Sequence, residues 1–233
     1  MKAKVFFKLV VIALIIGINV NVYAQDEKSE QEYKTLFSNK DGRTEHGGYL
    51  GLTIGYTDID ARPALEIGGR AAWVINHQFA FGFAGKGFFN NLDKPTPALD
   101  SDYFLAGGYG GLFFQPILFP KSPVHVSFPI ILGAGGVYLN PRENKKYHWD
   151  YDYDYNYSYD SDFYLVFEPG VEVEFNMLRY LRMAVGASYK FTNDVNLVYE
   201  YAVDGQDAKN SITVSPSALD NFSVNIAIMF GWF

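Results

Sequence analysis

The sequence predicts an all-β fold, an eight-stranded antiparallel up-and-down barrel. Three observations favour it. Aromatic residues make up 18% of the chain, with 22 glycines, a mixture that suits strands better than helices. Eight segments alternate apolar with polar or small residues, which is the two-residue period of a strand with two different faces. The connections between these segments differ systematically in length.

The segment 181–192 has the clearest alternation. Its odd-numbered positions, beginning with Leu181 and Met183, are apolar or aromatic, whereas Arg182, Lys190 and small residues occupy the even positions. Each of the eight segments is long enough to cross a bilayer as a tilted strand. The predicted strands are 48–57, 64–75, 79–90, 103–115, 124–138, 163–175, 181–192 and 222–233.

Connections on one side of the predicted barrel are short and those on the other are mostly long. The short group comprises 76–78, 116–123 and 176–180. The opposite group comprises 91–102, 139–162 and 193–221, with 58–63 as a short exception. Short turns on one side and long loops on the other are typical of barrels with periplasmic turns and extracellular loops.

The N-terminus has the features of a secretory signal peptide. Lysines precede an apolar segment at 9–20, and Val22-Tyr23-Ala24 fits a cleavage site. The alternative is an uncleaved anchor, but twelve apolar residues are too few for a helix to span roughly 30 Å of hydrocarbon. We therefore expect cleavage after Ala24. The predicted organisation is a signal peptide at 1–24, a polar periplasmic lead-in at 25–46 and a barrel at 47–233.

The placement of charge distinguishes a transmembrane barrel from a soluble eight-stranded calyx, the main structural alternative. A soluble barrel needs charged residues along the outside of its strands. The segments 103–115, 124–138 and 222–233 contain no Asp, Glu, Lys or Arg. Such a wall would aggregate in water but suits lipid. The sequence therefore predicts a barrel in the bacterial outer membrane.

The charges that do occur within strands comprise four acids and four bases, all away from the apolar face. They are Glu66, Arg70, Lys86, Glu168, Glu172, Glu174, Arg182 and Lys190. An eight-stranded barrel has an interior only wide enough for side chains. We expect these groups to pair inside it and plug the lumen, because unpaired buried charges are costly. The alternative is a narrow, gated ion path.

The region 47–233 resembles the OmpA/OmpX-type outer-membrane β-barrel family. The resemblance lies in its length, its strand number, the segment 168–175 (EPGVEVEF), and His125-Val126-Ser127-Phe128-Pro129 followed by Gly133-Ala134-Gly135-Gly136. The ending Met229-Phe230-Gly231-Trp232-Phe233 is similar to the signal that such barrels present to their assembly machinery, although Phe233 is out of phase with the apolar face. The resemblance implies fold and location. It does not imply one activity, since this fold carries adhesins, structural barrels and enzymes.

The loop 139–162 contains an unusual repeat in which aromatic residues alternate with acidic or polar ones. This period suggests a protruding hairpin with a tyrosine face and a carboxylate face, and tyrosine is common in binding surfaces. The alternative is a solvated low-complexity loop. Candidate partner-contact residues are Tyr147, Trp149, Tyr151, Tyr153, Tyr155, Tyr157 and Tyr159.

A calcium site in the same loop has little support. Asp150, Asp152 and Asp154 have the spacing that opens an EF-hand loop, but Tyr155 stands where glycine is needed and Ser161 where a bidentate glutamate is needed. We predict no metal and no cofactor. In the loop 193–221, residues 196–202 and 211–215 could pair across Asp204-Gly205 as a second ribbon.

An enzyme that modifies lipid would need a held histidine near the outer rim. The chain has four histidines, and only His148 falls on the predicted outer side, within the long loop, where nothing holds its geometry. The other three are His46, His77 and His125, all expected near the periplasmic side. We therefore predict a barrel without catalytic residues.

The leading functional hypothesis is a non-enzymatic outer-membrane barrel whose extracellular loops adhere to or bind a partner. The alternatives are a structural barrel for envelope integrity, a narrow channel or a lipid-modifying enzyme. Expected partners are outer-membrane lipid and lipopolysaccharide, the barrel assembly machinery and an extracellular partner. A net charge of -7 argues against nucleic acid, and the absence of cysteine excludes a disulfide framework.

Overall fold

The computed structural model describes residues 44–90, 103–141, 160–202 and 209–233, without the side chains of 103, 141 and 199–212. The signal segment and almost all of the lead-in lie outside the described residues. No helix in these ranges is long and apolar enough to cross a membrane.

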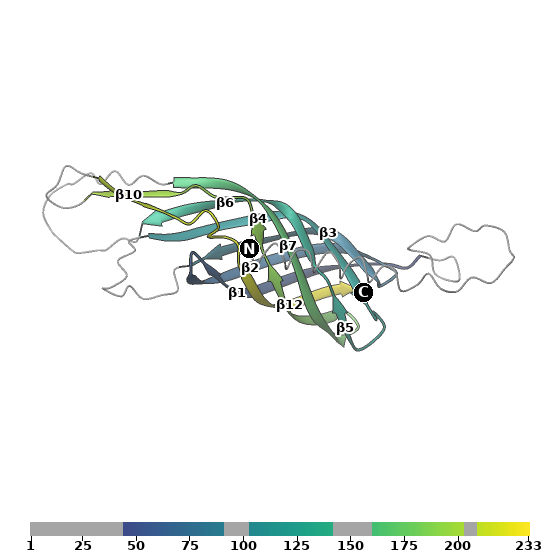
Figure 1. Ribbon diagram of the computed structural model, residues 1–233. Coiled ribbons are helices and arrows are strands. Elements are labelled where there is room, and N and C mark those ends of the chain that lie inside the picture. The colour runs from purple at the N-terminus through teal and green to yellow at the C-terminus, as the bar shows by residue number, and fades with distance from the viewer. Residues whose placement is uncertain (1–43, 91–102, 142–159, 203–208) are drawn as a thin grey trace, which may run out of the picture. The chain divides into compact units, whose positions relative to one another are not determined.

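Eight antiparallel strands form a closed ring (Figure 1). Each pairs with its neighbours in the chain, and β12 pairs with β1 from Gly48↔Trp232 to Thr57↔Ser223, which closes the barrel. All eight predicted strands are confirmed. In ring order they are β1 (His46–Ile59), β2 (Arg62–Ile75), β3 (Phe79–Phe89), β4 (Tyr103–Leu118), β5 (Val124–Ser127) continued by β6 (Ile130–Pro141), β7 (Asp160–Leu178), β8 (Leu181–Tyr189) continued by β9 (Phe191–Thr192), and β12 (Phe222–Trp232).

Two ring strands that the sequence predicts as continuous are interrupted. The prediction of one strand over 124–138 is wrong at Phe128 and Pro129, which leave the ladder between β5 and β6. Pro129 has no N–H to donate to a neighbouring strand, so the ladder is interrupted there. The N–H of the preceding residue, Phe128, bonds to the carbonyl of Pro116 at 2.9 Å. The predicted strand 181–192 breaks at Lys190, whose N–H bonds to the carbonyl of Asn221 at 3.0 Å.

The strand connections define two different ends of the barrel. The turn end carries the connections 76–78, 119–123 and 179–180, and the loop end carries 60–61, 90–102, 142–159 and 193–221. Asn76 and His77 both have positive φ, at 50° and 60°, as the central residues of a type I′ hairpin turn do. The predicted separation of short turns from long connections is therefore confirmed.

The connection 193–221 is largely structured and closes the loop end. Its strands β10 (Val198–Ala202) and β11 (Lys209–Thr213) pair as the predicted ribbon, and Figure 1 shows β10 at the opposite end of the barrel from β5. Apolar side chains on both sides of this ribbon pack with strand residues at the loop end. We call this group the apolar cap: Ile59, Leu105, Leu139, Val195, Leu197, Val214 and Leu219, each at most 1% exposed.

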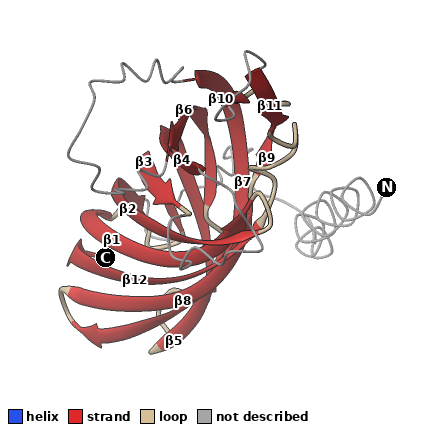
Figure 2. Cartoon of the chain, turned by 90° about the vertical axis from the view of Figure 1, so that its left-hand side faces the viewer, coloured by secondary structure: helices blue, strands red, loops and turns tan. Residues whose placement is uncertain are grey.

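The two faces of the ring strands have opposite chemistry. Along β1 the inward positions between Tyr49 and Ile59 are glycine and threonine, whereas Leu50, Leu52 and Ile54 face outward and are 59–71% exposed. Figure 2 shows β1, β12 and β8 lying side by side in the barrel wall. Among described residues of the ring strands, Asp58 beside the β1–β2 turn is the one exposed Asp, Glu, Lys or Arg. The outer wall is thus an apolar surface, and the polar groups are collected inside.

Candidate functional site

The candidate site is the interior of the barrel, where the structure brings together all eight charged residues singled out in the sequence. Each is at least partly withdrawn from solvent, and seven are 7% exposed or less. Glu66 and Arg70 project from β2, and Lys86 projects from β3. Glu168, Glu172 and Glu174 project from β7. Arg182 belongs to β8, and Lys190 is the residue that follows this strand. The period of two directs them inward, because the alternate residues of these strands form the outer wall.

Nearest the loop end lies a four-residue group that we call the upper cluster: Glu66, Lys86, Glu168 and Lys190. Lys86 Nζ is 2.5 Å from Glu168 and 3.6 Å from Glu66, and Lys190 Nζ is 2.8 Å from Glu66. Two carboxylates therefore alternate with two ammonium groups. Removing an isolated ion from water is very costly, and the mutual attraction of the four charges offsets much of that cost.

Neutral hydroxyl groups complete the upper cluster. Glu168 accepts hydrogen bonds from Tyr109 at 2.6 Å and from Ser188 at 2.5 Å, while Glu66 accepts one from Ser223 at 2.8 Å. The ammonium group of Lys190 also lies 4.8 Å from the ring centroid of Phe88. Each of the two carboxylates is thus bound by three donor groups from three different segments of the ring.

The middle of the lumen is occupied by one bidentate pair. The two terminal nitrogens of Arg70 donate to the two oxygens of Glu172 at 3.0 and 2.9 Å, and both side chains are buried. The guanidinium group also lies 5.8 and 5.5 Å from the ring centroids of Tyr49 and Phe113. Fork-to-fork geometry of this kind is the strongest form of carboxylate pairing.

Nearest the turn end, Glu174 is the centre of a group that we call the lower cluster, with His125, Ser127, Gln115 and Arg182. His125 Nε2 lies 2.8 Å from Glu174, and Ser127 and Gln115 donate to it at 2.6 Å each. Arg182 makes a longer contact with Glu174, at 3.3 Å. Here one carboxylate accepts hydrogen bonds from the neutral side chains of Ser127 and Gln115 as well as contacting Arg182 and His125, whereas the upper cluster alternates two carboxylates with two ammonium groups.

Glycines on the inward faces make room for these long side chains. A Cβ added at Gly186 would lie 2.5 Å from Cγ of Glu172, and one added at Gly68 would lie 2.7 Å from Cγ of Lys86. Because real Cβ atoms do not approach so closely, these two positions need glycine for the charged groups to meet. The abundance of glycine in the sequence therefore has a direct role in filling the lumen.

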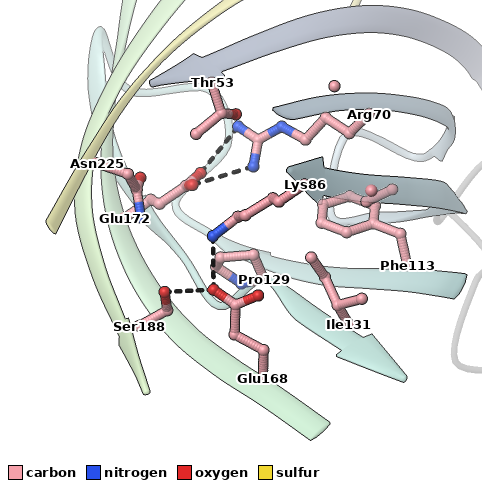
Figure 3. A pocket seen from close by; sticks show the side chains of 13 residues that line it. Thr53, Arg70, Lys86, Phe113, Pro129, Ile131, Glu168, Glu172, Ser188 and Asn225 are labelled. Carbon is pink, nitrogen blue, oxygen red and sulfur yellow. Dashed lines mark hydrogen bonds and ion pairs between the residues drawn. The ribbon is translucent and has the colours of Figure 1, made fainter. Parts of the chain in front are cut away.

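The space left between the clusters is very small. Figure 3 shows Arg70 directed toward Glu172 and Lys86 directed toward Glu168 around a cavity of about 30 Å³. That volume holds on the order of one or two water molecules. Asn225 lines the cavity, and its Oδ1 atom is buried without a hydrogen-bond partner among the described residues, so a water molecule is the natural donor for it. The packed clusters and the apolar cap thus fill much of the interior that the described residues line.

Several members of these clusters were not predicted from the sequence. Tyr49, Tyr109, Gln115, His125 and Ser127 all contribute hydrogen bonds inside the lumen. Each is an inward residue of a strand that carries no inward charge. The two-residue period was sufficient to find them, had neutral residues been included with the charged ones.

The described histidines form no catalytic arrangement. His125 and Ser127 both bind Glu174 rather than each other, so the hydroxyl group has no adjacent base. His77 contacts Glu45 at 2.6 Å, and His46 accepts a hydrogen bond from Trp73 at 3.2 Å. No group of three metal-ligating side chains occurs in the described part of the chain. His148 and the aspartates at 150, 152 and 154 lie outside it.

The predicted partner-contact residues Tyr147, Trp149, Tyr151, Tyr153, Tyr155, Tyr157 and Tyr159 also lie outside the described residues. The base of their hairpin is described, and β6 pairs with β7 as far as Leu139↔Asp160. At this base Tyr138 and Phe163 are 58% and 63% exposed. Two long strands therefore lead directly into the tyrosine-rich segment.

Comparison with solved structures identifies the same architecture in known proteins. Neisserial surface protein A (NspA) matches with a TM-score of 0.50 at 10% identity, over 81% of this chain and 98% of NspA. The chain therefore has the fold of the small outer-membrane β-barrel proteins. The resemblance to OmpA/OmpX-type barrels is confirmed at this level.

Two further matches are more distant. A major outer membrane protein from Thermus thermophilus matches with a TM-score of 0.49 at 9% identity, over 79% of this chain and 99% of that protein. Ail, the attachment invasion locus protein of Yersinia pestis, matches with a TM-score of 0.42 at 9% identity, over 80% and 97%. No family model matches the sequence, and no curated protein does.

Proposed function

We propose that this protein is a closed β-barrel of the bacterial outer membrane whose extracellular loops bind a partner or mediate adhesion. The observation that carries the proposal is the combination of an apolar outer wall with a lumen filled by ion pairs. Such a barrel is suited to lipid on its outside and offers no path through its inside. Its accessible chemistry is then that of its loops.

The outer wall supports the membrane location. Large apolar side chains are exposed all around the ring, including Phe83, Leu165 and Ile226 at 54–68%, on strands far apart in the sequence. Leaving so much apolar surface in water is unfavourable, whereas lipid covers it at no cost. Export would use the predicted signal segment 1–24, insertion would use the barrel assembly machinery, and lipid and lipopolysaccharide would surround the wall.

The distribution of loops supports the orientation. Barrels of this class carry short periplasmic turns and longer extracellular loops, so we assign the turn end to the periplasm and the loop end to the exterior. The apolar cap then closes the outer mouth. The hairpin that follows β6 would project beyond it and present the tyrosines at 147–159 to a partner.

Deleting the hairpin tip tests the binding proposal. Replacing 142–159 by a short Gly-Ser turn keeps the strand ends on both sides, because β6 still pairs with β4 up to Pro141 and β7 still pairs with β6 from Asp160. The barrel should therefore fold and reach the surface unchanged. We expect the adherence of expressing cells to fall to the level of cells without the protein. Binding of the purified barrel to host or bacterial surfaces should likewise fall to background. A matched control replaces 203–208 at the tip of the β10–β11 ribbon, and this variant should keep its binding.

A second pair of variants separates the two faces of the hairpin. Changing Tyr151, Tyr153 and Tyr155 to serine removes aromatic contact area and should abolish binding. Changing Asp150, Asp152 and Asp154 to asparagine retains the tyrosines and should weaken binding only in a salt-dependent manner. Unchanged adherence in the deletion and in the tyrosine variant would refute the adhesive role and favour a structural barrel for envelope integrity.

A further inference from the structure

A second, larger hollow lies at the turn end, separate from the filled lumen. Its volume is about 570 Å³, and it is bordered by all three turns and by the end of β12. The lining includes three cationic and three apolar side chains: Lys121, Arg179, Arg182, Met177, Leu178 and Phe233. None of these belongs to the loop surface of the proposed function.

The two exposed cations, Lys121 and Arg179, are held on neighbouring turns. Asn176, at the end of β7, ties these turns together. Its backbone N–H bonds to the carbonyl of Pro123 at 2.9 Å, and its side-chain amide donates to the carbonyl of Ser122 at 3.0 Å. The turn that carries Lys121 is therefore fixed against the strand that leads to Arg179. Both positive charges are presented on the same side of the rim before any ligand arrives.

A buried cation, Arg182, also borders the hollow, although its charge is paired with Glu174 of the lower cluster. The side chain of Arg182 is 4% exposed, its guanidinium carbon lies 3.9 Å from the ring centroid of Phe233, and its Nε has no hydrogen-bond partner among the described residues. Its hydrogen bond to Glu174 measures 3.3 Å, which is long for a charged pair. Opposing negative charge near the hollow comes from Glu45, which His77 already binds, and from Glu174, which pairs with Arg182.

The shape of the lining indicates what kind of anion fits. Met177 and Leu178, at the end of β7, are 55% and 52% exposed at the rim, whereas Arg182 is a buried residue of β8. The hollow therefore reaches across the rim, from the barrel mouth to the apolar outer wall. A ligand that matches this surface has an anionic head and an apolar body. The volume of the hollow also exceeds what a free phosphate ion would fill.

We propose that this hollow binds the phosphate group of an anionic phospholipid from the periplasmic leaflet. Lys121 and Arg179 would contact the phosphate, and the acyl chains would lie against Met177 and Leu178 and continue onto the apolar outer wall. Arginine and lysine together are the usual protein ligands of phosphate. The inference rests on the proposed membrane location, because that location brings lipid to the rim.

Native mass spectrometry of the folded full-length barrel in non-ionic detergent tests this site. The probes are dihexanoyl phosphatidylglycerol, dihexanoyl phosphatidylcholine and inorganic phosphate. We expect one phosphatidylglycerol molecule to be retained per barrel, with much weaker retention of phosphatidylcholine. The double variant Lys121→Gln/Arg179→Gln should bind phosphatidylglycerol roughly 10- to 30-fold more weakly, as the loss of two charges near a lipid phosphate implies.

The matched control is Arg62→Gln, which removes one cation at the loop end and should leave phosphatidylglycerol retention unchanged. Equal retention by the double variant, or equal binding of both lipids, would overturn the inference. Displacement of the lipid by an equal concentration of inorganic phosphate would also overturn it and assign the site to a free anion. A failure of the proposed membrane location would be distinguishable, since the protein would then show no folded detergent-resistant form with a heat-dependent gel mobility. A failure of loop binding alone would leave phosphatidylglycerol retention unchanged.

Discussion

The inward and outward faces of the same strands are adapted to two different environments. In β2, Glu66 is buried among two ammonium groups and a hydroxyl group, whereas its neighbour Ile67 is 53% exposed on the wall. A soluble protein with this topology would place its apolar residues inside and its charges outside. The reversal shows that the outside of this barrel is built for an apolar solvent, and that the inside must satisfy its own charges without help from water.

The largest expected effect comes from breaking the bidentate pair on the inward face. Arg70→Met leaves Glu172 as a buried carboxylate without its partner, which should lower the free energy of unfolding by about 3–5 kcal/mol. The double variant Arg70→Met/Glu172→Leu should recover most of this loss, because no unpaired charge remains. Urea unfolding of the barrel in lipid vesicles measures both. A double variant as unstable as the single one would show that the pair itself, rather than charge neutrality, sustains the lumen.

An intermediate effect is expected from a charge on the outward face. Ile226 lies at the centre of β12 opposite Ile54 and is 54% exposed. Ile226→Arg should lower the free energy of unfolding in a bilayer by about 2–4 kcal/mol, since arginine is costly at the midplane. The control is Phe222→Arg at the strand end, where about 0–1 kcal/mol is expected because the group reaches the interface. Equal stability of both variants would contradict a lipid-facing wall.

A smaller effect is expected from a neutral donor inside the lumen. Ser223→Ala removes the hydroxyl group that donates to Glu66 at 2.8 Å, while Lys190 and Lys86 stay in place. We expect a loss of about 1–2 kcal/mol, the usual cost of one hydrogen bond to a buried charged group. Ser161→Ala at the loop end is the matched serine control and should change the unfolding free energy very little. A loss at Ser223 as large as that of Arg70→Met would mean that hydroxyl groups, not ion pairs, dominate the interior.

Much of this contrast could be predicted from the sequence because it depends on a local period. Alternation predicts all eight ring strands, and the same alternation identifies the inward charges from Glu66 to Lys190. Which cation meets which carboxylate could not be predicted. Arg70 and Glu172 are separated by 102 residues, and their meeting depends on the register of the whole ring.

Features without a period escaped the sequence analysis. Val195, Leu197, Val214 and Leu219 occur in an irregular connection that resembles an ordinary loop in sequence, yet they are buried in the apolar cap. Their burial results from tertiary packing against Ile59 and the ends of other strands. The break at Pro129 was predictable in principle, because proline interrupts a ladder. Buried His125, by contrast, lies at an inward position of the alternating segment 124–127, so the period itself could have placed it in the lumen.

The central claim is that this chain is an outer-membrane barrel with a self-contained, filled interior. Cell fractionation followed by electrophoresis with and without boiling tests it most directly. We predict that the protein is found in the outer-membrane fraction and changes mobility only after boiling, because the closed strand ring with its paired lumen charges resists detergent at room temperature. A soluble periplasmic protein with the same mobility in both samples would contradict the account.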